Sequence, residues 1–172
     1  MSGSERESRT VVAVERVSFL SDRPFDDVVE DIYSGLGHTG DFGGLLASWG
    51  AAADVAEFDA LTDQVSGSSG LIEFLTLDLG DVLAKRLPGR DYRMLRIIAG
   101  NPVTMSKMTA SVPDAGSYAP VTILVAERPD GVYLAYDTVS SPIAPYGIAE
   151  ASAVARDLDA AVLRLLREAA TG

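Results

Sequence analysis

The stretch VTILVAERPDGVYLAYDTV, residues 121–139, decides the fold class. Its two halves, residues 121–127 and 132–139, are rich in β-branched and aromatic side chains and are typical of strands. The tetrapeptide between them places Pro129 at the second position of a tight turn and Gly131 at its end. Because so short a turn joins only antiparallel neighbours, the sheet is predicted to be at least partly antiparallel.

Upstream of this hairpin, three further strands are predicted, over residues 10–19, 71–78 and 92–100. A helix is predicted over residues 24–37, where Pro24 suits the first helical position. Its apolar side chains recur at i, i+3, i+4, i+7, i+8 and i+11, which is one stripe of a helix. They are Phe25, Val28, Val29, Ile32, Tyr33 and Leu36.

Two more helices follow from the same periodicity, a short one over residues 51–65 and a long one over residues 148–170. Residues 80–91 predict a helical turn that ends at a Pro-Gly pair. The glycine pairs of residues 38–50 predict irregular structure before the short helix, and a flexible loop is expected over residues 66–70.

The predicted element order defines an α+β fold of the form β-α-(insertion)-β4-α. We expect a largely antiparallel sheet with helices packed on one face. Residues 10–172 are interpreted as a single domain with an extra segment at residues 41–69. Residues 1–9 are polar and are predicted to form a disordered tail.

Composition excludes several classes of function. The formal net charge of −11 argues against a nucleic-acid partner, because binding a polyanion takes clustered Lys and Arg. The chain has no cysteine and one histidine, so we expect neither a metal site nor a metal cofactor, and no other cofactor is indicated. No apolar run is long enough for a membrane span, and no signal peptide is recognisable. A soluble cytoplasmic protein is therefore expected.

Residues 70–102 (GLIEFLTLDLGDVLAKRLPGRDYRMLRIIAGNP) and 119–137 (APVTILVAERPDGVYLAYD) resemble the DUF302 family. The resemblance rests on an ordered set of motifs: a strand ending in Gly-Asn-Pro, a short loop containing Met or Leu, a Pro-led strand, an acidic–Gly turn and an aromatic-Tyr strand. The resemblance implies a fold similar to the TATA-binding-protein class, usually dimeric, and implies little about function.

This sequence departs from the family pattern in two places. Members of the family resemble one another in a strand that carries an Asp-His pair. This chain has Asp78 followed by Leu79 at that place, so any role of the family's histidine is absent. The segment at residues 41–69 also looks longer than is usual in the family. It contains the glycine-punctuated apolar run FGGLLASWG with Phe42 and Trp49, which predicts a lid over a pocket, a buried patch at a second subunit or a locally packed loop.

The corner Gly100-Asn101-Pro102 has two interpretations. Gly, Asn and Pro together turn a strand without needing a ligand. Alternatively, backbone amides and the Asn101 side chain orient a small polar group, with Lys107 five residues further on.

Titratable residues supply candidate catalytic groups. His38 is the only imidazole, and Asp41 is the carboxylate nearest in sequence that could orient it. Residues 35–40, which include His38, match G-x-G-x-x-G by letter, but a predicted helix precedes the motif, so it is not a dinucleotide site.

Two strands supply the other candidates. Asp78 is a candidate catalytic residue because its side chain is expected to face a cavity. Tyr133 and Asp137 share one face of their strand and are a candidate acid–base pair.

Three functions stay open on this sequence. The first is a homodimeric binding module for a small, largely apolar molecule, with Phe42, Trp49, Asn101 and Lys107 as candidate ligand contacts. The second is a metal-free enzyme that uses His38, Asp78, Lys107, Tyr133 or Asp137 for acid–base chemistry. The third is a structural or interaction dimer without a ligand. A dry apolar cavity favours the first, and a titratable group facing a closed cavity favours the second.

Overall fold

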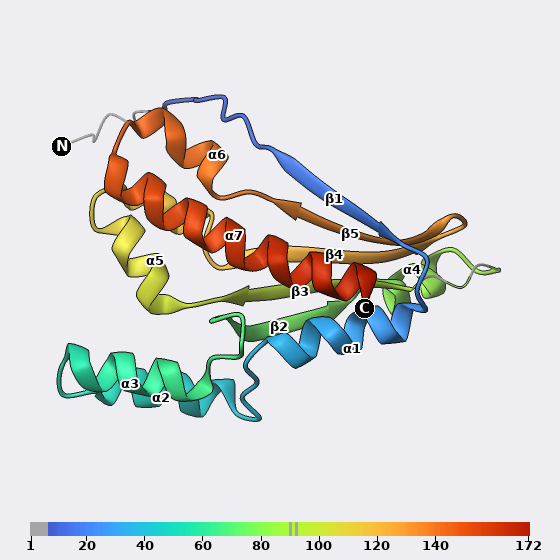
Figure 1. The fold of residues 1–172 in the computed structure, drawn as a ribbon, viewed down its shortest axis with the longest axis horizontal. Coiled ribbons are helices and arrows are strands. Elements are labelled where there is room, and N and C mark those ends of the chain that lie inside the picture. Colours follow the sequence, from blue (N-terminus) through green and yellow to red (C-terminus); the bar gives the residue numbers. More distant parts are fainter. Residues whose placement is uncertain (1–6, 90, 92) are drawn as a thin grey trace, which may run out of the picture.

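The fold is a five-stranded antiparallel sheet with two long helices on one face (Figure 1). The structure is a computed structural model that describes residues 7–89, 91 and 93–172. Strand order across the sheet is β1-β5-β4-β3-β2, and every neighbouring pair is antiparallel. The expected α+β class and the antiparallel sheet are therefore confirmed.

The elements follow in this order along the chain: β1 (Arg16–Ser21), α1 (Phe25–Gly35), α2 (Phe42–Ala51), α3 (Val55–Val65), β2 (Ile72–Asp78), α4 (Leu79–Arg86), β3 (Met94–Gly100), α5 (Pro102–Thr109), η1 (Pro113–Ser117), β4 (Val121–Arg128), β5 (Gly131–Asp137), α6 (Ser140–Ile143), η2 (Ala144–Tyr146) and α7 (Ala149–Thr171).

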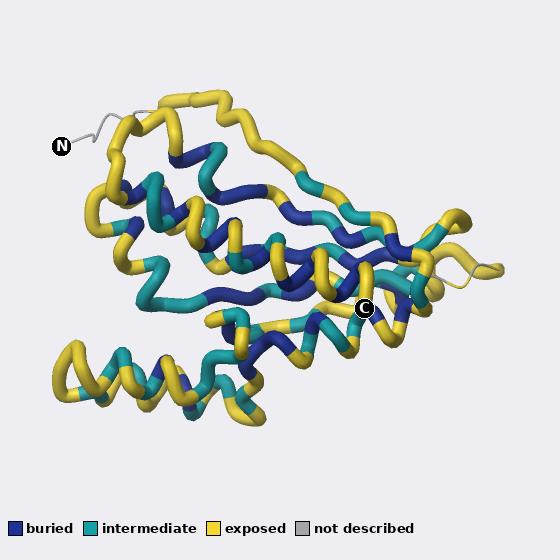
Figure 2. The backbone as a smooth tube through the Cα atoms, in the orientation of Figure 1, coloured by how far each residue is buried: buried dark blue, intermediate teal, exposed yellow. Residues whose placement is uncertain are grey.

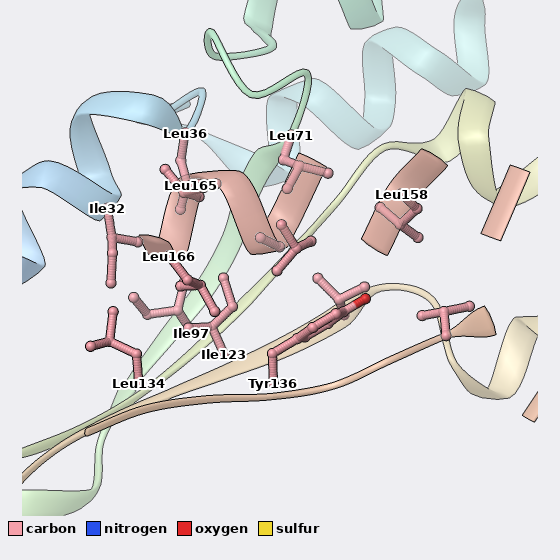
Figure 3. Packing of buried hydrophobic residues seen from close by; sticks show 14 of the residues in the cluster. Ile32, Leu36, Leu71, Ile97, Ile123, Leu134, Tyr136, Leu158, Leu165 and Leu166 are labelled. Carbon is pink, nitrogen blue, oxygen red and sulfur yellow. The ribbon is translucent and has the colours of Figure 1, made fainter. Parts of the chain in front are cut away.

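The core lies between the sheet and the helices α1 and α7 (Figure 3). Alternate residues of the central strands point into it, as the burial pattern of β5 shows. Fully burying one Val, Leu or Ile side chain in such a core contributes about 1.5–3 kcal/mol to the free energy of unfolding. The labelled members of this core are Ile32, Leu36, Leu71, Ile97, Ile123, Leu134, Tyr136, Leu158, Leu165 and Leu166.

The first strand lies further along the chain than the sequence predicts. Residues 10–15 are exposed and carry no regular structure, and β1 begins at Arg16. The strand pairs with β5 from Arg16, opposite Asp137, to Ser21, opposite Val132. Beyond Asp137 the chain turns into α6, so the valines before Arg16 have no strand to pair with.

Two helices replace segments for which the sequence predicts irregular structure. Residues 42–51 form α2, because Asp41 caps the helix by accepting a hydrogen bond from the backbone N of Gly44 at 2.8 Å. Residues 102–109 form α5, where the family resemblance implies a short loop. Pro24 precedes α1 instead of occupying its first helical position. The predicted strand start at residue 92, most of the predicted tail and residue 90 lie outside the described residues.

Helices α2 and α3 lie beyond the start of β2, on the side of α5, and most of their residues are exposed or half-buried (Figures 1 and 2). In the part of the chain that the structure describes, no helix is long and apolar enough to cross a bilayer. The same residues contain no cluster of three or more His, Cys, Asp or Glu side chains placed to hold a metal ion.

Candidate functional site

An open groove of about 610 Å³ lies where α2, β2, β3, α5 and the loop before β4 meet. We call it the apolar groove, because none of the residues that line it carries a charge. The lining residues are Phe42, Leu46, Trp49, Phe74, Leu75, Ile98, Asn101, Pro102, Met105, Ala119 and Pro120. The groove therefore brings together Phe42, Trp49 and Asn101, three of the four ligand contacts proposed from the sequence.

Helix α2 supplies the aromatic wall of the apolar groove. Phe42, Leu46 and Trp49 recur at the spacing of one helix face. The ring of Phe42 lies 5.2 Å from that of Phe74, centroid to centroid, and Trp49 meets Phe74 edge-on at 6.4 Å. These are the separations at which aromatic pairs attract. Leu46 stays 51% exposed, so its side chain is open to a ligand.

A β-bulge brings Phe74 to the same groove. Glu73 pairs with Ala99 while Leu75 pairs with Ile98, so Phe74 is the extra residue of β2. Phe74 and Leu75 both line the groove, although strict alternation would send neighbouring side chains to opposite faces. Sequence alternation contains no sign of this bulge, so Phe74 was not predictable as a residue of the site.

The Gly-Asn-Pro corner is the N-terminus of α5. The Oδ1 atom of Asn101 accepts hydrogen bonds from the backbone N of Val103 at 2.9 Å and of Thr104 at 3.2 Å. Its Nδ2 atom donates to the carbonyl O of Gly70 at 3.0 Å. The amide thus joins a helix cap to the loop before β2, and its polar atoms are already used. Lys107 is exposed on α5 and does not line the apolar groove.

His38 lies in a network at the start of β2. Its Nδ1 atom is 2.8 Å from Oε2 of Glu73, and its Nε2 atom is 2.8 Å from the carbonyl O of Tyr33. The expected partner Asp41 instead caps α2. Burial raises the pKa of the Tyr33 hydroxyl, which donates to Thr76 at 3.0 Å. Both imidazole nitrogens therefore lie at hydrogen-bond distance from oxygen atoms of the protein, and His38 does not line the apolar groove.

The remaining catalytic candidates have separate structural partners. Asp78 is exposed and caps α4 by accepting from the backbone N of Asp81 at 2.9 Å, so it does not face a cavity. The Tyr133 hydroxyl donates to Asp130 at 2.5 Å. Asp137 accepts from Nε and Nη2 of Arg16 at 2.5 and 2.8 Å. Tyr133 and Asp137 share a face, as predicted, but each is paired with a different residue.

A second groove, of about 520 Å³, lies on the outer face of the sheet, opposite α1 and α7. We call it the polar groove. The charged residues that line it are Arg16, Arg96 and Asp137, and Ser117, Tyr118, Thr122 and Thr138 add hydroxyl groups. The hydrogen bonds and charge of Arg16 hold the pKa of the Asp137 carboxyl below its usual range.

Replacing Asp137 with asparagine is expected to lower the urea midpoint slightly at pH 7 and to leave it unchanged in acid. A carboxyl whose pKa is lowered by folding stabilises the fold above its ordinary pKa of about 3.9. That stability is lost as the pH falls through the lowered value. The effect is small because the side chains of Arg16 and Asp137 are 67% and 46% exposed. Urea unfolding at neutral and strongly acidic pH measures it, and an equal loss at both would contradict it.

Comparisons with known proteins agree with this fold. A family model described as "Domain of unknown function DUF302" matches residues 50–165. A solved structure, the crystal structure of an uncharacterized conserved DUF302 protein from Bacillus stearothermophilus, superimposes with a TM-score of 0.61 at 8% identity. The similarity covers 90% of this chain and 97% of that one. No curated protein matches the chain.

Proposed function

The chain belongs to the DUF302 family, whose description assigns no activity, and on that premise we propose that it binds a small, largely apolar molecule in the apolar groove. One observation carries the proposal: Phe42, Trp49 and Phe74 converge with aliphatic side chains on a groove whose lining bears no charge. Its volume of about 610 Å³ lies within the range of small-molecule sites. Such sites are mostly apolar with few polar groups, as this one is.

The acid–base enzyme is the weaker candidate. None of its five proposed residues lines the apolar groove: His38, Asp78, Lys107, Tyr133 and Asp137. A general acid or base must lie within hydrogen-bond reach of the reacting atom. An uncharged groove therefore favours binding over proton transfer, and an open groove favours binding over a ligand-free structural dimer.

A neutral hydrophobic dye tests the binding proposal, and we expect Nile red to bind saturably. Trp49 is the only tryptophan and lines the groove, so its fluorescence should change in parallel with that of the dye. Leu46→Glu should weaken binding about tenfold, or about 1.4 kcal/mol, because it places a carboxylate against the apolar part of the ligand.

Val82→Glu is the matched control for this experiment. Val82 is an exposed aliphatic residue on α4, 58% accessible against 51% for Leu46, and it does not line the groove. The dye should bind this variant as it binds the natural chain. Absence of saturable binding, or equal weakening by both substitutions, would contradict the proposed site.

The homodimer and the cytoplasmic location stay predictions. Leu75 and Leu77 are exposed apolar residues of β2, and Leu20 is one of β1, the strand at the opposite edge of the sheet. Exposed apolar edge strands support an association of two chains. Native mass spectrometry of the purified protein should therefore report twice the mass of 18.1 kDa. A monomer at micromolar concentration would contradict the dimer. A denatured run beside it would identify a small molecule retained from the cell.

A further inference from the structure

The apolar and polar grooves meet on the outer face of the sheet. Pro120 lines both of them. On β3, Ile98 lines the apolar groove and Arg96 lines the polar groove. The two residues are separated by one position, so their side chains leave the same face of the strand about 7 Å apart. Thr122, which lines the polar groove, pairs with Ile98 across β3 and β4. A single elongated molecule can therefore contact both grooves.

Arg96 is exposed to solvent and is the charged residue of this junction that has no strong protein partner within the described part of the chain. Among the described residues it forms no ion pair, and its one side-chain hydrogen bond is a long contact of 3.5 Å from Nη2 to Oγ1 of Thr122. Arg16, in the same groove, is held by both oxygens of Asp137. The guanidinium of Arg96 thus keeps donors that are free for an anion.

The local charge also differs from that of the whole chain. Two arginines and one aspartate line the polar groove, which leaves one unbalanced positive charge there. The chain as a whole has a formal net charge of −11. One uncompensated guanidinium matches one carboxylate, which it can bind through two parallel hydrogen bonds. A phosphate monoester carries more negative charge than this groove balances.

We propose that the ligand is an amphipathic carboxylate, with its hydrocarbon part in the apolar groove and its carboxylate bound to Arg96. This inference rests on the proposed function and specifies the chemical class of its ligand. The apolar groove supplies the contact area, and Arg96 supplies the discrimination in favour of a charged head group. The hydroxyl of Thr122 lies beside the guanidinium and is a second donor to the carboxylate.

The test compares dodecanoate with dodecanol, which have equal chain lengths and differ at the head group. Both are titrated by calorimetry at pH 8, below the concentrations at which dodecanoate forms micelles. The natural chain should bind dodecanoate at least tenfold more tightly than dodecanol. Arg96→Gln should abolish that preference and leave dodecanol binding unchanged, because the alcohol uses only the apolar groove.

Arg156→Gln is the matched control, since it changes the net charge equally. Arg156 is exposed on α7, the helix that packs on the opposite face of the sheet. This variant should keep the full preference for dodecanoate. Raising the salt concentration should reduce the preference in both the natural chain and the control.

The outcomes separate the two proposals. Saturable dodecanol binding without a preference for dodecanoate would overturn the carboxylate inference and leave the apolar site standing. A preference that survives in Arg96→Gln would also overturn it. If neither compound binds, both proposals fail.

Discussion

Asp159→Ala is expected to destabilise the folded chain by roughly 3–5 kcal/mol. Asp159 lies on α7 and is 5% exposed. Its Oδ1 atom accepts hydrogen bonds from the Tyr136 hydroxyl at 2.7 Å and the backbone N of Val139 at 2.8 Å. Its Oδ2 atom accepts from the backbone N of Ser140 at 3.0 Å. The carboxylate therefore joins the end of β5 to α7, and its removal leaves three donors without a partner.

The hydroxyl of Tyr136 is one of these donors, and it is buried. Tyr136 is 1% exposed, and burial raises the pKa of its hydroxyl far above the ordinary value. The group therefore stays protonated and needs an acceptor. Tyr136→Phe removes one donor together with its need for a partner, so we expect a smaller loss of about 1 kcal/mol.

Urea unfolding at pH 7 measures these differences as shifts of the midpoint at constant slope. Asp157→Ala is the control, because Asp157 lies on the same helix and is exposed. Its midpoint should stay close to that of the natural chain. Equal midpoints for Asp157→Ala and Asp159→Ala would show that the buried carboxylate does not stabilise the junction.

The sheet and its two long helices were predictable because each has a strong periodic pattern. The hairpin between β4 and β5 follows from Pro129 and Gly131, and α7 follows from an apolar stripe that its buried residues confirm. The position of β1 was not predictable in the same way. Its valines before Arg16 have strand propensity, but pairing depends on where β5 ends, and that information lies more than a hundred residues away.

Helix α2 was missed because its sequence lacks the usual signals. It contains three glycines, and its apolar residues are not separated by charged ones, so no polar face is visible. Its start depends on one cap, the hydrogen bond from Gly44 to Asp41. In α5 the corresponding signal was present: Asn followed by Pro is a helix start as well as a turn.

The candidate site was only partly predictable because its residues converge from five parts of the chain. Phe42, Trp49 and Asn101 were identified because each is conspicuous locally, as an aromatic among glycines or a corner residue. Ile98 and Met105 look like ordinary core residues, and nothing local distinguishes them from Ile97 or Met108, which are buried. Only the register of β2 on β3 and the position of α2 show that Ile98 and Met105 line the groove and that Ile97 and Met108 do not.

Gly37→Ala is expected to destabilise the chain by roughly 3 kcal/mol and to disrupt the apolar groove. The two ends of the α2–α3 segment meet at Gly37 and Gly67, which both donate to the carbonyl O of Leu71, at 2.8 and 3.0 Å. A Cβ atom on Gly37 would overlap the carbonyl O of Val65 and lie 2.7 Å from the backbone N of Gly67. These are backbone atoms, so no side-chain rotation relieves the clash.

Gly40→Ala is the control for this effect, because a Cβ atom there meets nothing within 4 Å and the residue lies in the same loop. Urea unfolding should show a large fall in the midpoint for Gly37→Ala alone. Nile red binding to the fraction that stays folded should weaken as well, since moving α2 takes Phe42 and Trp49 away from Phe74. A destabilised variant that still binds the dye normally would show that the groove does not depend on the anchoring of α2. Because two glycines hold the wall of the site to the sheet, we expect stability and binding to fall together.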